Sequence, residues 1–321
     1  MSAPTLSTLP PLPQLQSVLS PAAEAAARIT SLSWVLIVGA ALIFAGMMAL
    51  LAIAVGRGAG GRSVRTRIWL LGGGVAFPLL VLGSLFAYSA ARTPSWLAQP
   101  PPGALVVGIT AHMWWWEVRY RDPASGQEVV LANELHLPVG RPVWLGLSSA
   151  DVIHSFWVPA LAGKRDMLPG RVGHLLLQAS RAGVYRGQCA EFCGEQHARM
   201  ALHVVAQEPT EFAAWLAAQA RPAAPPSSAL LERGRQVFLE QRCNACHTVR
   251  GVAAEGRLGP DLTHVGSRLY LGAGTLVNRA GSLAHWVSDT QAIKPGARMP
   301  SSPEIDVVAL QALAAWLEYL Q

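Results

Sequence analysis

Residues 189–200 read Cys-Ala-Glu-Phe-Cys-Gly-Glu-Gln-His-Ala-Arg-Met, and this stretch concentrates soft metal-binding side chains. It carries two thiols, one imidazole and one thioether, from Cys189, Cys193, His197 and Met200. Sulfur and imidazole donors suit copper better than magnesium or calcium, which prefer oxygen. A second imidazole is available from His154, in the upstream stretch Asp-Val-Ile-His-Ser-Phe-Trp-Val-Pro. The residue types therefore predict a copper site.

Two other uses of these residues stay open. Two cysteines and two histidines also form structural zinc sites, although zinc rarely recruits a thioether such as that of Met200. Alternatively, Cys189 and Cys193 are joined by a disulfide bond. Residue types alone rank copper first and do not exclude the other two.

The two stretches together resemble the CuA motif of cytochrome c oxidase subunit II. The similarity covers GQCAEFCGEQHARM at residues 187–200 and DVIHSFWVP at residues 151–159. It implies two copper ions that share bridging thiolates, so that one electron is spread over both ions and little moves on reduction. The implied ligands are the thiolates of Cys189 and Cys193, the imidazoles of His154 and His197, the thioether of Met200 as a weak ligand, and the backbone carbonyl of Glu191.

The resemblance also assigns roles outside the ligand set. In the aromatic run at residues 112–120, Trp114 matches the tryptophan associated with electron entry from cytochrome c. Met113 stands where relatives usually carry glutamine, and a simple buried aromatic cluster is the alternative interpretation of the run. The side chain of Glu191 is implied to help hold a magnesium or manganese ion at the boundary with subunit I.

Composition indicates a membrane protein. Only 14% of the 321 residues are charged, against about a quarter in soluble domains. Residues 34–55 and 68–91 contain no charged side chain, and each run exceeds the roughly 20 residues that cross a bilayer. We therefore expect a transmembrane helical hairpin over residues 31–92, after an irregular Pro/Ala-rich segment at residues 1–30. The net charge of +6 is not concentrated in a basic run with interleaved aromatics, so nucleic acid is not an expected partner.

The arginines predict the orientation of this hairpin. The flanks outside the spans carry only Arg28 and Arg92, whereas the connecting loop carries Arg57, Arg62, Arg65 and Arg67. By the positive-inside rule the loop is cytoplasmic, so both termini and everything after residue 92 are expected on the periplasmic side of a bacterial inner membrane. Thr66 stands where relatives often carry a glutamate near a proton pathway, which places proton entry at this point in doubt.

Residues 93–220 are expected to form an all-β domain followed by a short helix at 209–220. Short apolar runs broken by glycine and proline recur at 104–109, 128–131, 142–147, 152–158, 172–177 and 202–205. Strands at this spacing are typical of a sandwich or barrel. The resemblance implies a cupredoxin-like Greek-key barrel with its metal-binding loops at one end. Residues 221–228, which are rich in proline, are expected to be a linker.

Residues 229–321 carry a second cofactor motif. Cys243-Asn-Ala-Cys246-His247 is the attachment pattern of c-type haem, in which the two thiols bond to the haem and the histidine binds iron. A zinc or redox C-x-x-C site is the alternative. Met299 is the only methionine after Met200 and is the expected second axial ligand, with His264 and His285 as rivals. With helices expected at 229–242 and 304–320, this region resembles an all-α class I cytochrome c.

The combined resemblance implies subunit II of a caa-type cytochrome c oxidase. Electrons would pass from a donor through haem c and CuA to the haem of subunit I, where dioxygen is reduced to water with proton translocation. The chain itself would relay electrons without a catalytic constellation. Implied partners are subunits I and III, lipid, and a donor such as cytochrome c or a bc-type complex. The alternatives are a subunit of a CuA-containing nitric oxide reductase and a membrane-anchored copper and haem carrier.

Overall fold

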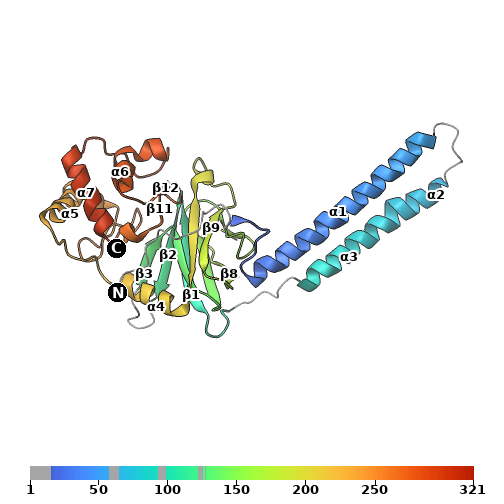
Figure 1. The fold of residues 1–321 in the computed structure, drawn as a ribbon, viewed down its shortest axis with the longest axis horizontal. Coiled ribbons are helices and arrows are strands. Elements are labelled where there is room, and N and C mark those ends of the chain that lie inside the picture. Colours follow the sequence, from blue (N-terminus) through green and yellow to red (C-terminus); the bar gives the residue numbers. More distant parts are fainter. Residues whose placement is uncertain (1–15, 58–64, 93–98, 122–125, 127) are drawn as a thin grey trace. The chain divides into compact units, whose positions relative to one another are not determined.

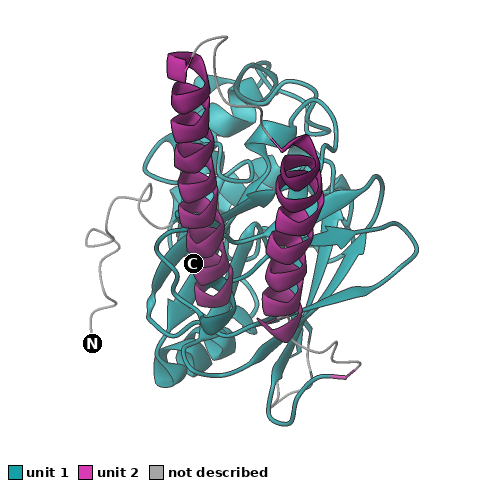
Figure 2. Cartoon of the chain, turned by 90° about the vertical axis from the view of Figure 1, so that its right-hand side faces the viewer, with its two compact units in different colours: residues 1–26, 100–321 teal, residues 27–99 magenta. Residues whose placement is uncertain are grey.

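The computed structural model describes residues 16–57, 65–92, 99–121, 126 and 128–321. The chain divides into two compact units, one made of residues up to 26 together with 100–321, and the other of residues 27–99 (Figure 2). Residues 1–15 of the expected N-terminal segment and Arg62 of the expected loop lie outside the described residues.

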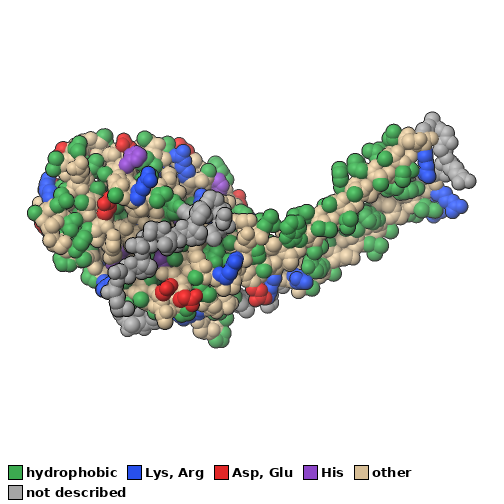
Figure 3. Space-filling view, viewed as in Figure 1, with side chains coloured by type: hydrophobic (Ala, Val, Ile, Leu, Met, Phe, Trp, Pro, Cys, Tyr) green, Lys and Arg blue, Asp and Glu red, His purple; other side chains and the backbone are tan. Residues whose placement is uncertain are grey.

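Both expected membrane spans form helices. Helix α1 covers Glu24–Arg57, and a second helical segment comprises α2 (Thr66–Ile68), the π-helical η4 (Trp69–Ala76) and α3 (Phe77–Arg92). Both segments are long and apolar enough to cross a membrane, and Figure 3 shows hydrophobic side chains along their length and basic ones where α1 ends and α2 begins.

Helix α1 starts earlier than predicted. Its first residue, Glu24, lies inside the segment 1–30 that we expected to be irregular. Pro21 is the last proline before it, and the alanines that follow have the highest helix propensity of all residues. Local propensity therefore extends the helix beyond the apolar run.

A β-sandwich, defined as residues 100–207, belongs to the unit that contains residues 100–321 (Figure 1). Among the described residues it contains two five-stranded sheets, with strand orders β3-β2-β1-β5-β8 and β4-β10-β9-β6-β7. The pairs β1·β5 and β10·β4 are parallel, and the other neighbours are antiparallel. The strands are β1 (Leu105–His112), β2 (Trp115–Arg121), β3 (Glu128–Ala132), β4 (Glu134–Pro138), β5 (Val143–Ser149), β6 (His154–Trp157), β7 (Arg165–Met167), β8 (Gly173–Leu177), β9 (Gly183–Cys189) and β10 (Ala201–Gln207).

The all-β prediction is confirmed, and each of the six predicted runs overlaps a described strand. Strands β2, β4, β7 and β9 were not predicted. Strand β2 overlaps the aromatic run, and its charged residues alternate with buried Trp116, Val118 and Tyr120. Strand β9 contains two glycines, Gly183 and Gly187, which weaken any local strand signal.

The core of the sandwich continues directly into the predicted copper loop. In β1, the buried side chains of Val107, Ile109 and Ala111 alternate with more exposed ones, as expected for a strand with one face on a core. Cys189, Cys193 and Met200 belong to the same buried cluster as these residues. The candidate ligands are thus held by close-packed apolar residues.

The C-terminal helical region, defined as residues 221–321, follows α4 (Pro209–Gln219). It contains α5 (Ala229–Glu240), α6 (Ser282–Ile293), α7 (Val307–Tyr319) and a small hairpin of β11 (Tyr270–Leu271) and β12 (Leu276–Val277). The short 3₁₀ helices are η5 (His197–Arg199) in the copper loop, η6 (Cys243–Ala245) and η7 (Val265–Ser267). The helices expected at 209–220, 229–242 and 304–320 are present, whereas α6 was not predicted.

Helices α5 and α7 pack closely enough to require glycine. A Cβ atom on Gly234 of α5 would lie 2.1 Å from the carbonyl oxygen of Ala312 in α7. Caps fix the start of both helices, because Ser228 accepts a hydrogen bond from Leu231 N and Asp306 accepts one from Ala309 N. Phe238 of α5 and Leu313 and Leu317 of α7 line the same cavity as the C-x-x-C-H segment.

Candidate metal centre and haem cavity

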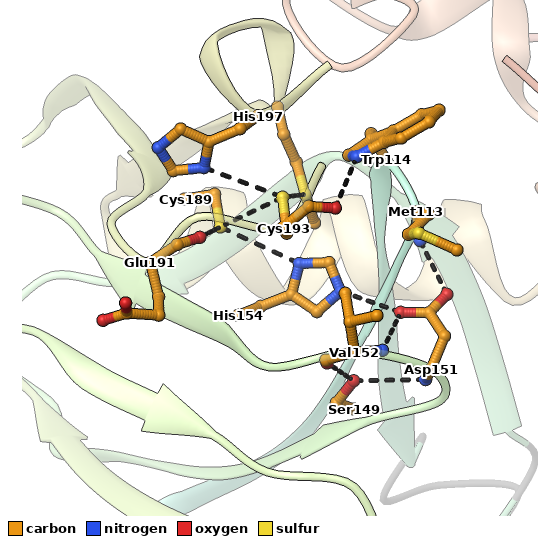
Figure 4. Close-up of polar contacts among 11 residues, drawn as sticks. Met113, Trp114, Ser149, Asp151, Val152, His154, Cys189, Glu191, Cys193 and His197 are labelled. Atoms are coloured by element: carbon orange, nitrogen blue, oxygen red, sulfur yellow. Dashed lines mark hydrogen bonds and ion pairs between the residues drawn. The ribbon is translucent and has the colours of Figure 1, made fainter. Parts of the chain in front are cut away.

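Strand β6 and the loop between β9 and β10 bring the candidate copper ligands together (Figure 4). His154 begins β6 and Cys189 ends β9, and the antiparallel pairing of these strands sets Phe156 opposite Cys189. Cys193, His197 and Met200 follow in the loop. Cys189 and Cys193 are about 4% and 3% exposed, so the sulfurs are shielded from solvent.

The six predicted donors form one connected cluster. The two thiol sulfurs lie 3.7 Å apart. Nδ1 of His154 lies 3.8 Å from Sγ of Cys189, and Nδ1 of His197 lies 3.7 Å from Sγ of Cys193. The last two donors lie beside different sulfurs, with the carbonyl oxygen of Glu191 3.1 Å from Cys189 Sγ and Sδ of Met200 3.8 Å from Cys193 Sγ.

This donor set fits two copper ions. The cysteines are free thiols, and their separation of 3.7 Å is far from the roughly 2.0 Å of a disulfide bond. An ion about 2.3 Å from each sulfur can bridge them, because half of the sulfur–sulfur separation is shorter than one such bond. Six donors that include a thioether also exceed the four of a structural zinc site. The geometry thus favours the copper alternative over zinc and the disulfide.

The two thiols lie in contact and titrate together. Contact with Cys193 lowers the pKa of Cys189 to about 3. The pKa of Cys193 is raised by contact with Cys189 and by burial, so Cys193 keeps its proton. Burial acts to lower the pKa of His154, but its contacts with Cys189 and Asp151 outweigh burial and the pKa is raised. Metal binding requires deprotonated ligands and therefore releases this proton.

Asp151 orients the imidazole of His154 and was missed from the sequence. Its Oδ1 lies 2.9 Å from Nε2 of His154, while its Oδ2 accepts a hydrogen bond of 2.8 Å from Met113 N (Figure 4). A carboxylate on the outer nitrogen of a ligating histidine fixes the ring and increases ligand basicity. The only sequence signal was the position of Asp151 three residues before His154.

Trp114 connects the aromatic run to the copper loop. Its indole Nε1 donates a hydrogen bond of 2.9 Å to the carbonyl oxygen of Cys193 (Figure 4). Gly194 permits this approach, because a Cβ atom there would lie 3.1 Å from Cζ2 of Trp114 and the backbone φ is +111°. Trp114, the residue predicted to admit electrons, is therefore hydrogen-bonded to the backbone of the candidate copper ligand Cys193.

The side chain of Glu191 points away from the sulfurs and pairs with a lysine. Its Oε2 lies 3.2 Å from Nζ of Lys164, which also lies 3.5 Å from Asp166. The described residues contain one cluster of three or more potential metal-binding groups, formed by His154, Cys189 and Cys193. Glu191 is not part of a complete magnesium or manganese site within the described part of the chain.

A cavity of about 420 Å³ contains the predicted haem ligands. Cys243, Cys246, His247 and Met299 all line it. Nδ1 of His247 lies 2.8 Å from the carbonyl oxygen of Pro260, which leaves Nε2 for iron. Burial lowers the pKa of His247, so the imidazole stays in its neutral, metal-binding form. The residues fit a c-type haem.

Two other observations support Met299 over its rivals. His264 Nε2 lies 3.0 Å from the carbonyl oxygen of Arg221, His285 is exposed, and neither residue lines the cavity. The Met299 loop is held by Gln291, whose Nε2 donates to the carbonyl oxygens of Ala297 and Met299 at 2.7 Å each. Sequence reasoning missed Gln291, which lies in the unpredicted helix α6.

Part of the cavity wall comes from the sandwich. Met113, Trp114 and Trp115 line the same cavity as the C-x-x-C-H residues. Trp114 therefore contacts the haem cavity and, through its indole nitrogen, the backbone of Cys193. The two candidate cofactor sites share this one side chain.

Two family descriptions match the chain. "Cytochrome C oxidase subunit II, periplasmic domain" matches residues 122–207, and "Cytochrome c" matches residues 231–321. The chain is 38% identical over 217 residues to cytochrome c oxidase subunit 2 of Alkalihalophilus pseudofirmus, covering 67% of this chain and 61% of that protein. It is 31% identical over 228 residues to cytochrome c oxidase subunit 2 of Bacillus subtilis, covering 68% and 63%. The chain thus spans about six tenths of the length of these relatives.

A solved structure is also similar. The periplasmic domain of subunit II of cytochrome oxidase of Bradyrhizobium japonicum is 32% identical, with a TM-score of 0.34, and the match covers 38% of this chain and 96% of that one.

Proposed function

We propose that this chain, which matches the periplasmic domain of cytochrome c oxidase subunit II at residues 122–207 and cytochrome c at residues 231–321, is the electron-transfer subunit of a caa-type oxidase. When bound, the haem and the dinuclear copper supply one-electron chemistry with little rearrangement of the surrounding protein. Cys243 and Cys246 would attach the haem, and His247 and Met299 would bind its iron. Cys189, Cys193, His154, His197, Met200 and the Glu191 carbonyl would hold the copper ions.

The observation that carries this proposal is the position of Trp114. Its side chain lines the haem cavity and donates a hydrogen bond to the carbonyl of the candidate copper ligand Cys193. A short covalent and hydrogen-bonded connection between two redox sites is what an electron relay needs. A copper carrier would instead need exchangeable ligands, whereas Met200 is 1% exposed and both thiols are buried.

The partners follow from this role. We infer that subunit I receives the electrons and reduces dioxygen with proton translocation, and that Glu191 contributes to a magnesium or manganese site completed by subunit I. The arginines around the hairpin loop support an orientation with the sandwich and helical region in the periplasm. Thr66 leaves the proton entry route to another residue or subunit.

A comparison of terminal acceptors tests the proposal. The complex, purified by a tag on this chain, is supplied with reduced donor under dioxygen and then under nitric oxide. We expect rapid dioxygen consumption that is abolished by Cys189→Ser, which removes a bridging thiolate. Turnover with nitric oxide alone would assign the chain to a nitric oxide reductase instead.

A further inference from the structure

Lys294 is a buried cation between the helical region and the sandwich. It follows the last residue of α6 and is 3% exposed. Its ammonium donates to the carbonyl oxygens of Trp114 at 2.9 Å, Arg199 at 2.9 Å and Gly272 at 2.8 Å. A lysine ammonium has three N–H donors, so all three are used. Two of the three acceptors belong to the sandwich.

The surroundings of Lys294 make these carbonyls its essential partners. No described carboxylate forms an ion pair with it. Burial lowers the pKa of Lys294 to about 7, but three carbonyl acceptors require three N–H donors, which only the protonated ammonium has. A buried ammonium is costly unless hydrogen bonds replace its lost water. If the sandwich moved away, the ammonium would keep one carbonyl partner, that of Gly272, and would need water for the rest.

Neighbouring contacts join the same two surfaces. Arg199 Nη1 donates to the carbonyl oxygen of Ile293 at 2.7 Å, and Ala201 N donates to that of Ala273 at 2.9 Å. The rings of His203 and Tyr270 stack with centroids 4.2 Å apart and planes 6° from parallel. These contacts extend the connection from the copper loop along β10 to β11.

Trp114 is held from two sides by this arrangement. Lys294 binds its carbonyl oxygen, and its indole nitrogen binds the carbonyl oxygen of Cys193. Its ring lines the cavity that contains His247 and Met299. A shift of the helical region would therefore move the cavity away from Trp114 and weaken the hold on the tryptophan backbone.

We propose that Lys294 is a positioning residue that clamps the helical region to the sandwich, with Trp114 fixed as the shared wall between the haem cavity and the copper loop. The functional consequence rests on the proposed electron relay. The fused cytochrome is then a permanently docked electron donor. Residues 221–228 do not act as a flexible linker that lets the cytochrome move towards and away from the copper site.

The first test compares the chain's two lysines, buried Lys294 and exposed Lys164, with Lys164 as the internal control for labelling. The intact oxidase is labelled with a light amine-reactive ester, then unfolded and labelled with the heavy form, and the ratio at each lysine is read by mass spectrometry. We expect Lys294 to react at least about tenfold more slowly than the same lysine in a short unstructured peptide, because undocking must precede reaction. Reaction at the peptide rate would overturn the clamp.

The second test removes the ammonium with Lys294→Met in the full oxidase. We expect hydrogen–deuterium exchange in residues 269–274 to rise about tenfold, since hydrogen bonds to a charged group are lost. Because Lys294 also lines the haem cavity, its removal can shift the reduction potential of haem c, which is measured in parallel. Reoxidation of haem c should slow by more than that shift accounts for, while the haem spectrum stays unchanged. Arg279→Met, which removes an exposed cation just before α6, is the matched control and should change neither.

The outcomes separate the clamp from the proposed function. Unchanged exchange and unchanged haem reoxidation in Lys294→Met would contradict the clamp. If that variant does not assemble, the labelling of the natural protein still decides. If the complex does not consume dioxygen but Lys294 is protected, the proposed function is wrong and the clamp stands.

Discussion

At the scale of single residues, Asp151 determines how His154 presents its ring. The carboxylate holds Nε2 at 2.9 Å, so Nδ1 faces Cys189. We predict that Asp151→Asn lowers copper affinity by about 10- to 100-fold, as is typical when a residue that hydrogen-bonds the non-ligating nitrogen of a metal-binding histidine is replaced. Competition with a copper chelator measures this. Asp166→Asn, on a half-exposed carboxylate near Lys164, is the control, and equal losses in both variants would contradict the assigned role.

Trp114 provides a second test at this scale. Trp114→Phe keeps a ring against the haem cavity but removes the 2.9 Å hydrogen bond to the Cys193 carbonyl. We predict that copper and haem contents stay normal while haem c reoxidation slows. Trp115→Phe is the matched control, because Trp115 also lines the cavity but stacks on His112. Stopped-flow absorbance at the haem band follows both, and an unchanged rate in Trp114→Phe would rule out this role of the indole.

At the scale of elements, the contact between α5 and α7 depends on Gly234. We predict that Gly234→Ala destabilises the helical region by about 3 kcal/mol or more, because the new methyl group would overlap the Ala312 carbonyl. The haem-band thermal transition of the purified complex should move to lower temperature. Gln236→Ala, on the exposed face of α5, should leave it nearly unchanged. A transition unaffected in Gly234→Ala would mean that the two helices can separate without cost.

The contact between β10 and β11 is expected to weaken in acid. Burial lowers the pKa of His203 to about 4, whereas an unfolded histidine titrates near about 6.5. The unfolded state therefore binds more protons between these values, so stability falls as the pH drops from about 6.5 towards 4. Glu134 and Arg186 face His203 and act in opposite directions on its pKa.

Thermal transitions at pH 7 and pH 5 measure this dependence. His203→Gln should reduce the loss of stability between the two pH values, and exposed His285→Gln should not. An identical loss in His203→Gln would assign the acid sensitivity to another group.

The sequence predicted the elements that carry strong local patterns. The charge-free runs gave both apolar helices, and alternating apolar residues gave β1 and β5. Strand β9 and helix α6 were missed because glycines and scattered polar residues hide their periodicity. Tertiary pairing with β10 and β6 stabilises β9, and no local pattern contains that information.

At the scale of the whole molecule, the ligand types were predictable from the sequence. The residues that hold the ligands in position were not. Sequence spacing and the family resemblance identified Cys189 and Cys193 as copper ligands and His247 as a haem ligand. Lys294 and Gln291 act across long sequence separations or through backbone carbonyls, which leave no sequence pattern. The shared wall at Trp114 likewise depends on how residues about 130 to 185 positions apart meet around one cavity.

We propose that electrons leave haem c through the copper centre of the same chain. The most direct measurement mixes the fully reduced complex with dioxygen, without added cytochrome c, and follows oxidation of haem c by absorbance. We predict rapid haem oxidation in the natural protein and its loss in Cys189→Ser, with haem content unchanged. Equally rapid haem oxidation in Cys189→Ser would contradict the claim, because the electrons would then bypass the copper ligands.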